Sequence, residues 1–299
     1  MTVAPNFSHL SSTASALLHH TDEERIYAIR EGTWLAYPDA KRVIKHMEDL
    51  LSYPRVTRMP NLLLVAPSFN GKTSILQRFE ALHPPDEDPA KEVSLHPVVL
   101  VEMPPKPDIN DFYTRILDRL KAPYRHNATD REKYSQIKTL FRNMGVKMLV
   151  VDEIQHLISG GKVRQSEFRN ALKSLGNETG VVMVAAGIEE ALNAFNTDPQ
   201  MSSRFTPITL PLWRADKNFA SLLATLENRM PLKYPSNLKD PGMVLTLHNR
   251  SEGTIGDMCD LVKELAVDAI RSKAERITND RAKSFDWIPP SKRREYQRF

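Results

Sequence analysis

Short apolar runs alternate with segments of helical periodicity along the chain as far as about residue 212. Strands are predicted for the runs at 61–65, 98–101, 147–152, 180–186 and 208–210. Helices are predicted before and between them at 22–30, 38–51, 74–82, 108–120, 131–144 and around 168–175. Because strands and helices alternate through short connections, the pattern indicates an α/β fold with a doubly wound parallel sheet.

Beyond Trp213 only helical periodicity remains, at 216–229, 241–250 and 254–273. We therefore expect four parts. They are a flexible N-terminal arm at 1–20, a nucleotide-binding α/β domain with N-terminal helices at 21–212, a small all-helical lid at 213–285, and a basic C-terminal tail at 286–299.

Composition narrows the class of protein. Hydrophobic residues make up 41% of the 299 residues, enough for a substantial core. The single cysteine, Cys259, excludes an internal disulfide framework and a Cys-rich zinc site. No apolar run has the length of a membrane span, and the N-terminus lacks the pattern of an export signal. We expect a cytoplasmic protein with no membrane partner.

The net charge of +4 is concentrated at the C-terminal end. Residues 271–299 carry nine Lys and Arg against four Asp and Glu. A solvated helix and tail accounts for this run, and contact with nucleic acid or an acidic partner is the alternative.

The strand at 61–65 continues into a degenerate phosphate-binding loop. The full motif is G-x-x-x-x-G-K-[ST], whose backbone N–H groups surround phosphate while Lys reaches the β- and γ-phosphates and the hydroxyl binds Mg²⁺. Ala66 replaces the first glycine, whereas Gly71, Lys72 and Thr73 match the G-K-[ST] part of the motif, which contacts phosphate and Mg²⁺. The sequence predicts ATP and Mg²⁺ as cofactors, with nucleotide contacts from Ser68, Phe69, Asn70, Gly71, Lys72, Thr73 and Ser74.

Another buried strand, 147–152, ends in Asp152 and is followed by Glu153. At the carboxyl end of a parallel strand, Asp152 is expected to lie beside the loop and hold Mg²⁺ through water, while the Thr73 hydroxyl binds the ion. Glu153 is expected to polarise the attacking water. A solvated acidic pair is the alternative, and the phosphate loop earlier in the chain argues against it.

This order of parts resembles that of an AAA+ ATPase: helices, phosphate loop, acidic strand, a further strand, an arginine and a helical lid. The arginine is Arg204, which follows a short predicted helix and precedes the last strand. The resemblance implies that Arg204 acts in trans, in the catalytic site of a neighbouring subunit. An exposed arginine in a salt bridge is the alternative.

The flanking segments at 24–30, 34–38 and 58–64, together with Phe69-Asn-Gly-Lys-Thr73, resemble the TniB family. These are AAA+ transposition regulators related to TnsC and, more distantly, to MuB. The similarity extends from about Thr21 to Asp286. It implies an ATPase that forms homo-oligomeric rings or helical filaments on double-stranded DNA and recruits a TniA/TnsB-like transposase. Some members also work with a TniQ-like adaptor.

The resemblance also directs attention to channel loops that contact DNA phosphates. Lys106 and Thr129 match best, with Lys121, Arg125 and Arg131 nearby. Trp34 and Tyr37 are candidates for the adenine pocket or for ordinary packing.

Three departures favour ATP binding over fast hydrolysis. They are Ala66, the run Ala185-Ala-Gly-Ile188 with no polar sensor, and Gly253-Thr-Ile-Gly-Asp257 with no arginine. Two other classes therefore stay open, a nucleotide-gated DNA scaffold without significant hydrolysis and a small-molecule P-loop kinase.

Overall fold

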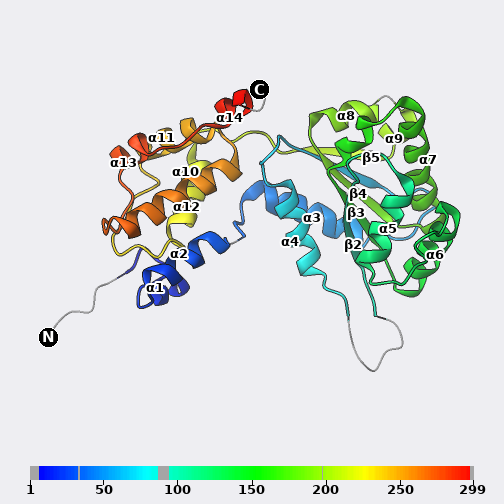
Figure 1. Ribbon diagram of the computed structural model, residues 1–299, viewed down its shortest axis with the longest axis horizontal. Coiled ribbons are helices and arrows are strands. Elements are labelled where there is room, and N and C mark those ends of the chain that lie inside the picture. The colour runs from blue at the N-terminus through cyan, green and yellow to red at the C-terminus, as the bar shows by residue number, and fades with distance from the viewer. Residues whose placement is uncertain (1–6, 33, 87–93, 197, 297–299) are drawn as a thin grey trace. The chain divides into compact units, whose positions relative to one another are not determined.

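A five-stranded, all-parallel sheet lies at the centre of residues 38–211 in the computed structural model of the protein, which describes residues 7–32, 34–86, 94–196 and 198–296 (Figure 1). The strand order is β2-β3-β4-β1-β5. The strands are β1 (Asn61–Val65), β2 (Val98–Glu102), β3 (Met148–Asp152), β4 (Val182–Gly187) and β5 (Phe205–Thr209). β1, β3 and β4 are buried throughout, which explains their continuous apolar sequences.

Helices cover both faces of this sheet, so the prediction of a doubly wound α/β fold is confirmed. β1 connects to β2 in one direction across the sheet, whereas β2, β3, β4 and β5 follow one another in the other direction. Because parallel crossovers are right-handed, the two directions place their helices on opposite faces. Figure 1 shows α3 and α4 on one face and α5 to α7 on the other. The helices of this α/β unit are α3 (Pro38–Leu51), α4 (Lys72–Leu82), α5 (Ile109–Arg119), α6 (Asp130–Asn143), the 3-10 helix η1 (Ile154–Ser159), α7 (Lys162–Thr179), α8 (Glu189–Asn196) and α9 (Pro199–Ser202).

The last strand is longer than its sequence indicates. We predicted 208–210 between two prolines, but β5 begins at Phe205 and contains Pro207 opposite Leu63 of β1. A proline lacks the N–H needed for a second ladder of hydrogen bonds. β5 lies at the edge of the sheet and has only one neighbouring strand, so Pro207 is tolerated there.

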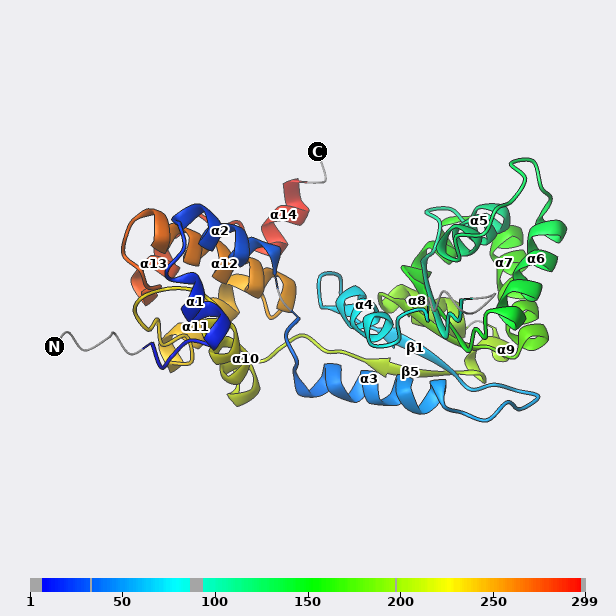
Figure 2. The same cartoon turned by 90° about the horizontal axis from the view of Figure 1, so that it is seen from below.

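The rest of the chain forms a second, helical unit made of Met1–Tyr37 and Leu212–Phe299. Its helices are α1 (Ser12–Leu17), α2 (Asp22–Glu31), α10 (Lys217–Glu227), α11 (Pro241–Ser251), α12 (Ile255–Arg271), α13 (Asn279–Ser284) and α14 (Pro290–Tyr296). The division near residue 212 lies where helical periodicity alone begins. Residues 21–37, which we had assigned to the α/β domain, group instead with the C-terminal helices, and Figure 2 shows α2 beside α12.

A buried ion pair explains why α2 joins the C-terminal helices. The Arg25 guanidinium, only 2% exposed, donates to both carboxylate oxygens of Glu275 and to the carbonyl of Pro231. Burial alone would raise the pKa of Glu275, but the hydrogen bonds and charge of Arg25 outweigh it and lower that pKa. These partners are far apart in the sequence, so the pairing could not be predicted from local pattern.

Both chain ends have contacts within the helical unit. Residues 1–6 of the expected arm at 1–20 lie outside the described residues; further along it, Ser11 caps α1, and the Ser11 N–H donates to the Asn228 carbonyl at 2.7 Å. Of the expected basic tail, residues 286–296 are described and include α14. Arg293 pairs with Asp257 at 2.8 Å, and the Trp287 indole donates to the Arg250 carbonyl at 3.1 Å. Within the described ranges, no helix has both the length and the apolar character needed to cross a membrane.

We expect Arg25→Ala to destabilise the helical unit by about 3 kcal/mol, because it leaves Glu275 charged and buried with only the more distant Lys233 ammonium, at 3.6 Å, as a cationic partner. Arg30→Ala is the matched control, since Arg30 is half exposed and meets Glu264 only at 3.8 Å. Its effect should stay below about 1 kcal/mol. Denaturant unfolding of both variants measures the difference, and similar midpoints would show that the buried pair does not hold α2 in place.

Candidate functional site

The loop between β1 and α4 has the backbone that a phosphate-binding turn requires. Phe69 and Gly71 adopt left-handed backbone angles, with φ of 61° and 85°. Ala66 lies outside the left-handed region, is buried, and donates its N–H to the Gly187 carbonyl at 3.1 Å. Alanine therefore replaces the motif's first glycine here without backbone strain.

Lys72 is held inside the curve of this loop. Its side chain is 5% exposed, and Nζ donates to the carbonyls of Ala66 and Pro67 at 2.9 and 3.0 Å. Burial lowers the pKa of Lys72, while the charges of Glu153 and Asp152 act in the opposite direction. The N–H groups of Lys72, Thr73 and Ser74 donate to no backbone carbonyl within the described part of the chain. A cation and free helix N–H groups together form a favourable site for phosphate.

The remaining loop residues differ in whether their side chains are buried or exposed. Asn70 is buried and donates to the carbonyls of Leu210 and Pro211 at 3.2 and 3.0 Å, which ties the loop to the segment after β5. Ser68, Phe69 and Ser74 are exposed. The Asn70 side chain therefore supports the loop and is not directed at a ligand.

Thr73 and Asp152 meet as the sequence predicted. The Thr73 hydroxyl donates to Asp152 Oδ2 at 2.6 Å. Thr73 follows β1 and Asp152 ends β3, and β4 lies between these two strands. Burial raises the pKa of Asp152, against the hydrogen bonds from Thr73 and from the Glu153 N–H. These two oxygens suit Mg²⁺, a hard cation that keeps several waters and substrate phosphates as ligands. Among the residues that the structure describes, no group of three His, Cys, Asp or Glu is placed to hold a metal ion.

Glu153 lies directly after β3 and has a partner that sequence reasoning missed. Its backbone is left-handed, with φ of 56°, which is rare for a residue with a side chain. The Gln155 side-chain amide donates to the Glu153 carboxylate. Gln155 Oε1 is buried and has no hydrogen-bond partner within the described ranges.

The end of β4 explains how Gln155 reaches this place. A Cβ at Gly187 would lie 2.8 Å from Gln155 Oε1 and 2.9 Å from Ile154 Cγ2, so only glycine leaves room for η1. The run 185–188 indeed has no polar side chain, and Gln155 brings an amide to the same corner from η1. Its position two residues after Glu153 was the only signal in the sequence.

Arg204 lies at the amino-terminal ends of the strands, whereas the phosphate loop lies at their carboxyl ends. The N–H of Asn61, the first residue of β1, donates to the Arg204 carbonyl at 3.0 Å. The loop begins at the other end of β1, about 16 Å away at the usual rise of a strand. The arginine side chain therefore cannot serve the phosphate loop of its own subunit.

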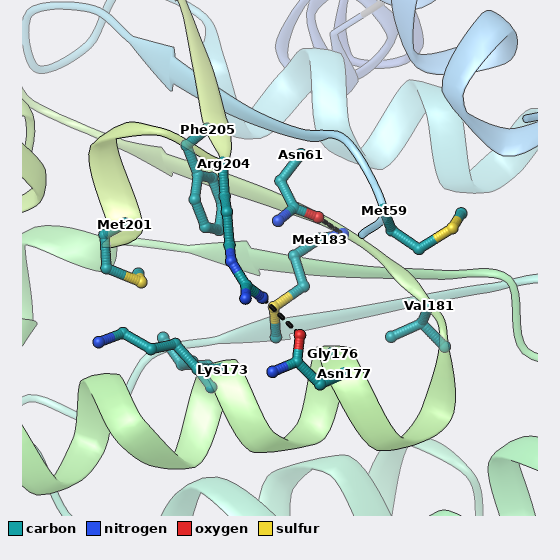
Figure 3. A pocket seen from close by; sticks show the side chains of 11 residues that line it. Met59, Asn61, Lys173, Gly176, Asn177, Val181, Met183, Met201, Arg204 and Phe205 are labelled. Carbon is teal, nitrogen blue, oxygen red and sulfur yellow. Dashed lines mark hydrogen bonds between the residues drawn. The ribbon is translucent and has the colours of Figure 1, made fainter. Parts of the chain in front are cut away.

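Arg204 lines a small pocket whose other residues are mainly apolar, among them Met59, Met183, Met201 and Phe205. Figure 3 shows its guanidinium directed toward α7, where it donates to the Asn177 side chain. The nearby carboxylate of Asp198 pairs with Lys173 at 2.8 Å, and no ion pair of Arg204 is found in the described ranges. The salt bridge that we considered as the alternative is absent from this part of the structure.

Three of the predicted DNA contacts lie near one another. Lys106 is exposed on the loop between β2 and α5, and Arg131 is exposed in the first turn of α6. Asn110 connects the two regions, since its amide donates to Asp130 Oδ1 at 2.7 Å. Thr129 caps α6, and its hydroxyl donates to Glu132 at 2.8 Å.

The other two predicted DNA contacts are Arg125 and Lys121. Arg125 is exposed near Glu132, whose pKa is lowered chiefly by the hydrogen bonds from Thr129 and also by the Arg125 charge. Lys121 follows the far end of α5, about 16 Å from its start at the usual helical rise. The structure therefore separates Lys121 from Lys106. Trp34 and Tyr37 belong to the helical unit, where the Tyr37 ring packs edge-on against Trp213 at 5.1 Å.

Comparison with known proteins gives a family match and a fold match. The family model for the bacterial TniB protein matches residues 25–215, well over half of the chain. Among curated proteins, none matches.

Similar solved structures include the Aeropyrum pernix ORC2 protein in ADPNP-ADP complexes, with 15% identity, a TM-score of 0.60, and coverage of 86% of this chain and 69% of that chain. Cdc6p from Pyrobaculum aerophilum is 16% identical, with a TM-score of 0.57, and the match covers 86% of this chain and 68% of that chain. Drosophila ORC bound to DNA is 14% identical, with a TM-score of 0.56, and the match covers 95% of this chain and 67% of that chain. At these identities the likeness establishes the fold, which is that of AAA+ proteins.

Proposed function

The chain belongs to the TniB family, and from this premise we propose that it is an ATP-dependent AAA+ regulator of DNA transposition that assembles on target DNA. The observation that carries the proposal is the cluster of Lys72, Thr73, Asp152 and Glu153 at one edge of the sheet. The similar ORC2 structure from Aeropyrum pernix is of ADPNP-ADP complexes, which supports a nucleotide as the ligand.

Each residue of the cluster has a role in this proposal. The Lys72 ammonium and the first N–H groups of α4 bind the β- and γ-phosphates. Thr73 and Asp152 would hold Mg²⁺, which would neutralise phosphate charge when bound. Glu153 accepts a proton from the attacking water, and Gln155 fixes the position of its carboxylate.

Completion of the site requires a second subunit. Arg204 is directed away from its own phosphate loop, at the edge of the sheet where a neighbour could present its nucleotide. We therefore propose a homo-oligomer, either a ring or a helical filament, in which Arg204 stabilises the transferring phosphoryl group in trans.

We propose that the DNA partner is a duplex and that the protein binds it largely without recognising its base sequence. Exposed cations at Lys106, Arg125 and Arg131 suit phosphate contacts, which position a protein without reading bases. That Drosophila ORC is bound to DNA in its structure supports this class of partner. Family membership supports a cytoplasmic location and the recruitment of a TniA/TnsB-like transposase, with a TniQ-like adaptor as a further partner.

One observation favours a second candidate, a nucleotide-gated DNA scaffold without significant hydrolysis. β4 ends in Ala185, Ala186 and Gly187, which offer no side chain to sense the γ-phosphate. Phosphate release measured with and without duplex DNA distinguishes the two. DNA-stimulated release supports the ATPase, binding without release supports the scaffold, and phosphorylation of a small molecule would support a kinase.

We expect Lys106→Ala combined with Arg131→Ala to weaken duplex binding to a similar extent for all sequences and to lower the salt slope by about 2. Lys41→Ala is the control, because Lys41 is exposed on α3 and makes no ion pair within the described ranges. Thr129→Ala is a poor test, since loss of the α6 cap alone destabilises by about 1 kcal/mol. Fluorescence anisotropy at several salt concentrations measures the slope. An unchanged slope would remove Lys106 and Arg131 from the DNA surface.

A further inference from the structure

Two loops lie against each other at the carboxyl edge of the sheet. The segment after β3, comprising η1 and the glycines 160 and 161, packs on the loop that follows β2. His156 Nδ1 donates to the Met103 carbonyl at 3.2 Å, and the Ser159 hydroxyl donates to the Pro105 carbonyl at 2.8 Å. A Cβ at Gly160 would lie 2.5 Å from Pro107 Cγ, so this contact requires glycine.

This packing groups three exposed cations. Lys106 belongs to the first loop, while Lys162 and Arg164 open α7 directly after the two glycines. None of the three makes an ion pair in the part of the chain that the structure describes. Between Lys162 and Arg164, Val163 is 72% exposed, so the first turn of α7 faces solvent.

Three other basic side chains of the same unit are neutralised. Arg119 pairs with Glu80, Lys138 with Glu178 at 2.8 Å, and Lys173 with Asp198 at 2.8 Å. The acidic residues next to the three cations do not neutralise them in this way. The Asp108 carboxylate accepts the Asp111 N–H at the start of α5, and Glu167 lies further along α7.

We propose that Lys106, Lys162 and Arg164 form one surface that contacts the phosphate backbone of duplex DNA. No sequence motif indicated Lys162 or Arg164. Lys121, which lies at the far end of α5, is not part of this surface. The inference rests on the proposed function, because it takes duplex DNA as the partner.

The same surface connects DNA to the nucleotide site through one short segment. Glu153 immediately precedes η1, and Gln155 within η1 contacts the Glu153 carboxylate. Lys162 follows the end of η1 after Gly160 and Gly161. A duplex bound at Lys162 and Arg164 would therefore contact the chain only a few residues after the segment that positions Glu153.

The test compares duplex affinity of the full chain, with a nonhydrolysable ATP analogue, across several salt concentrations. Lys162→Ala with Arg164→Ala should weaken binding on the order of tenfold to a hundredfold near 0.1 M salt and lower the salt slope by about 2. Lys162→Arg with Arg164→Lys preserves the charges and should bind as the wild type does. Lys41→Ala is the control for loss of an exposed cation elsewhere.

Each outcome is decisive for the inference. If the wild type binds duplex while the double alanine variant keeps its affinity and salt slope, the inference is overturned and the surface is left for an acidic protein partner. Weaker binding with an unchanged slope would also overturn it, since the residues would then act on structure and not on phosphates. A wild-type protein that binds no duplex in any nucleotide state would instead overturn the proposed function.

Discussion

Replacing Glu153 with glutamine should lower ATP turnover by about 10²–10⁴-fold while ATP binding persists. The substitution keeps the shape of the side chain but removes the carboxylate that accepts a proton from water. Lys72, Thr73 and Asp152 stay in place to bind phosphate and Mg²⁺. Phosphate release and binding of a fluorescent ATP analogue, measured on the same preparation, separate the two effects.

Lys72→Ala provides the complementary variant. It removes the buried ammonium that lies 2.9 Å from the Ala66 carbonyl, so ATP binding itself should be lost. Gln155→Ala should fall between the wild type and Glu153→Gln in turnover, because Glu153 remains but loses its amide partner. Undiminished turnover in Glu153→Gln would remove Glu153 from its assigned role.

Arg204→Ala should bind ATP as tightly as the wild type yet hydrolyse it several orders of magnitude more slowly, since an arginine supplied in trans contributes about 10³–10⁵-fold to such reactions. Mixing this variant with Lys72→Ala should restore activity that neither has alone. An intact pocket in one subunit then meets an intact Arg204 in its neighbour at about one junction in four. Arg58→Ala is a matched control, because Arg58 is exposed at the same edge and donates to the Ser203 carbonyl.

The mixing experiment requires proof that mixed assemblies form on DNA. If they form and stay inactive, Arg204 does not complete a neighbouring site. If Arg58→Ala reduces turnover as much as Arg204→Ala does, the edge has a general structural role and the specific assignment to Arg204 fails.

The sequence predicts local features of this fold well. Buried parallel strands are continuous apolar runs, so β1 to β4 were recognisable, and the loop motif identified Lys72 and Thr73. The meeting of Thr73 with Asp152 followed from a general rule, that the carboxyl ends of parallel strands share one edge of the sheet.

Features that depend on contacts between distant segments were not predictable in this way. The pairing of Arg25 with Glu275 moves α2 into the helical unit, yet neither residue differs locally from an exposed charge. The left-handed backbone of Glu153 and the space at Gly187 likewise arise from packing of η1 against β4. Pro207 misled the prediction of β5 because whether a strand lies at an edge is a property of the whole sheet.

Electron microscopy of the protein with duplex DNA and a nonhydrolysable ATP analogue tests the central claim most directly, namely that nucleotide bound at Lys72 drives assembly on DNA. The wild type should form rings or helical filaments on the duplex, and Lys72→Ala under the same conditions should leave the DNA bare. Dispersed single subunits of the wild type, with nucleotide bound and duplex present, would contradict it.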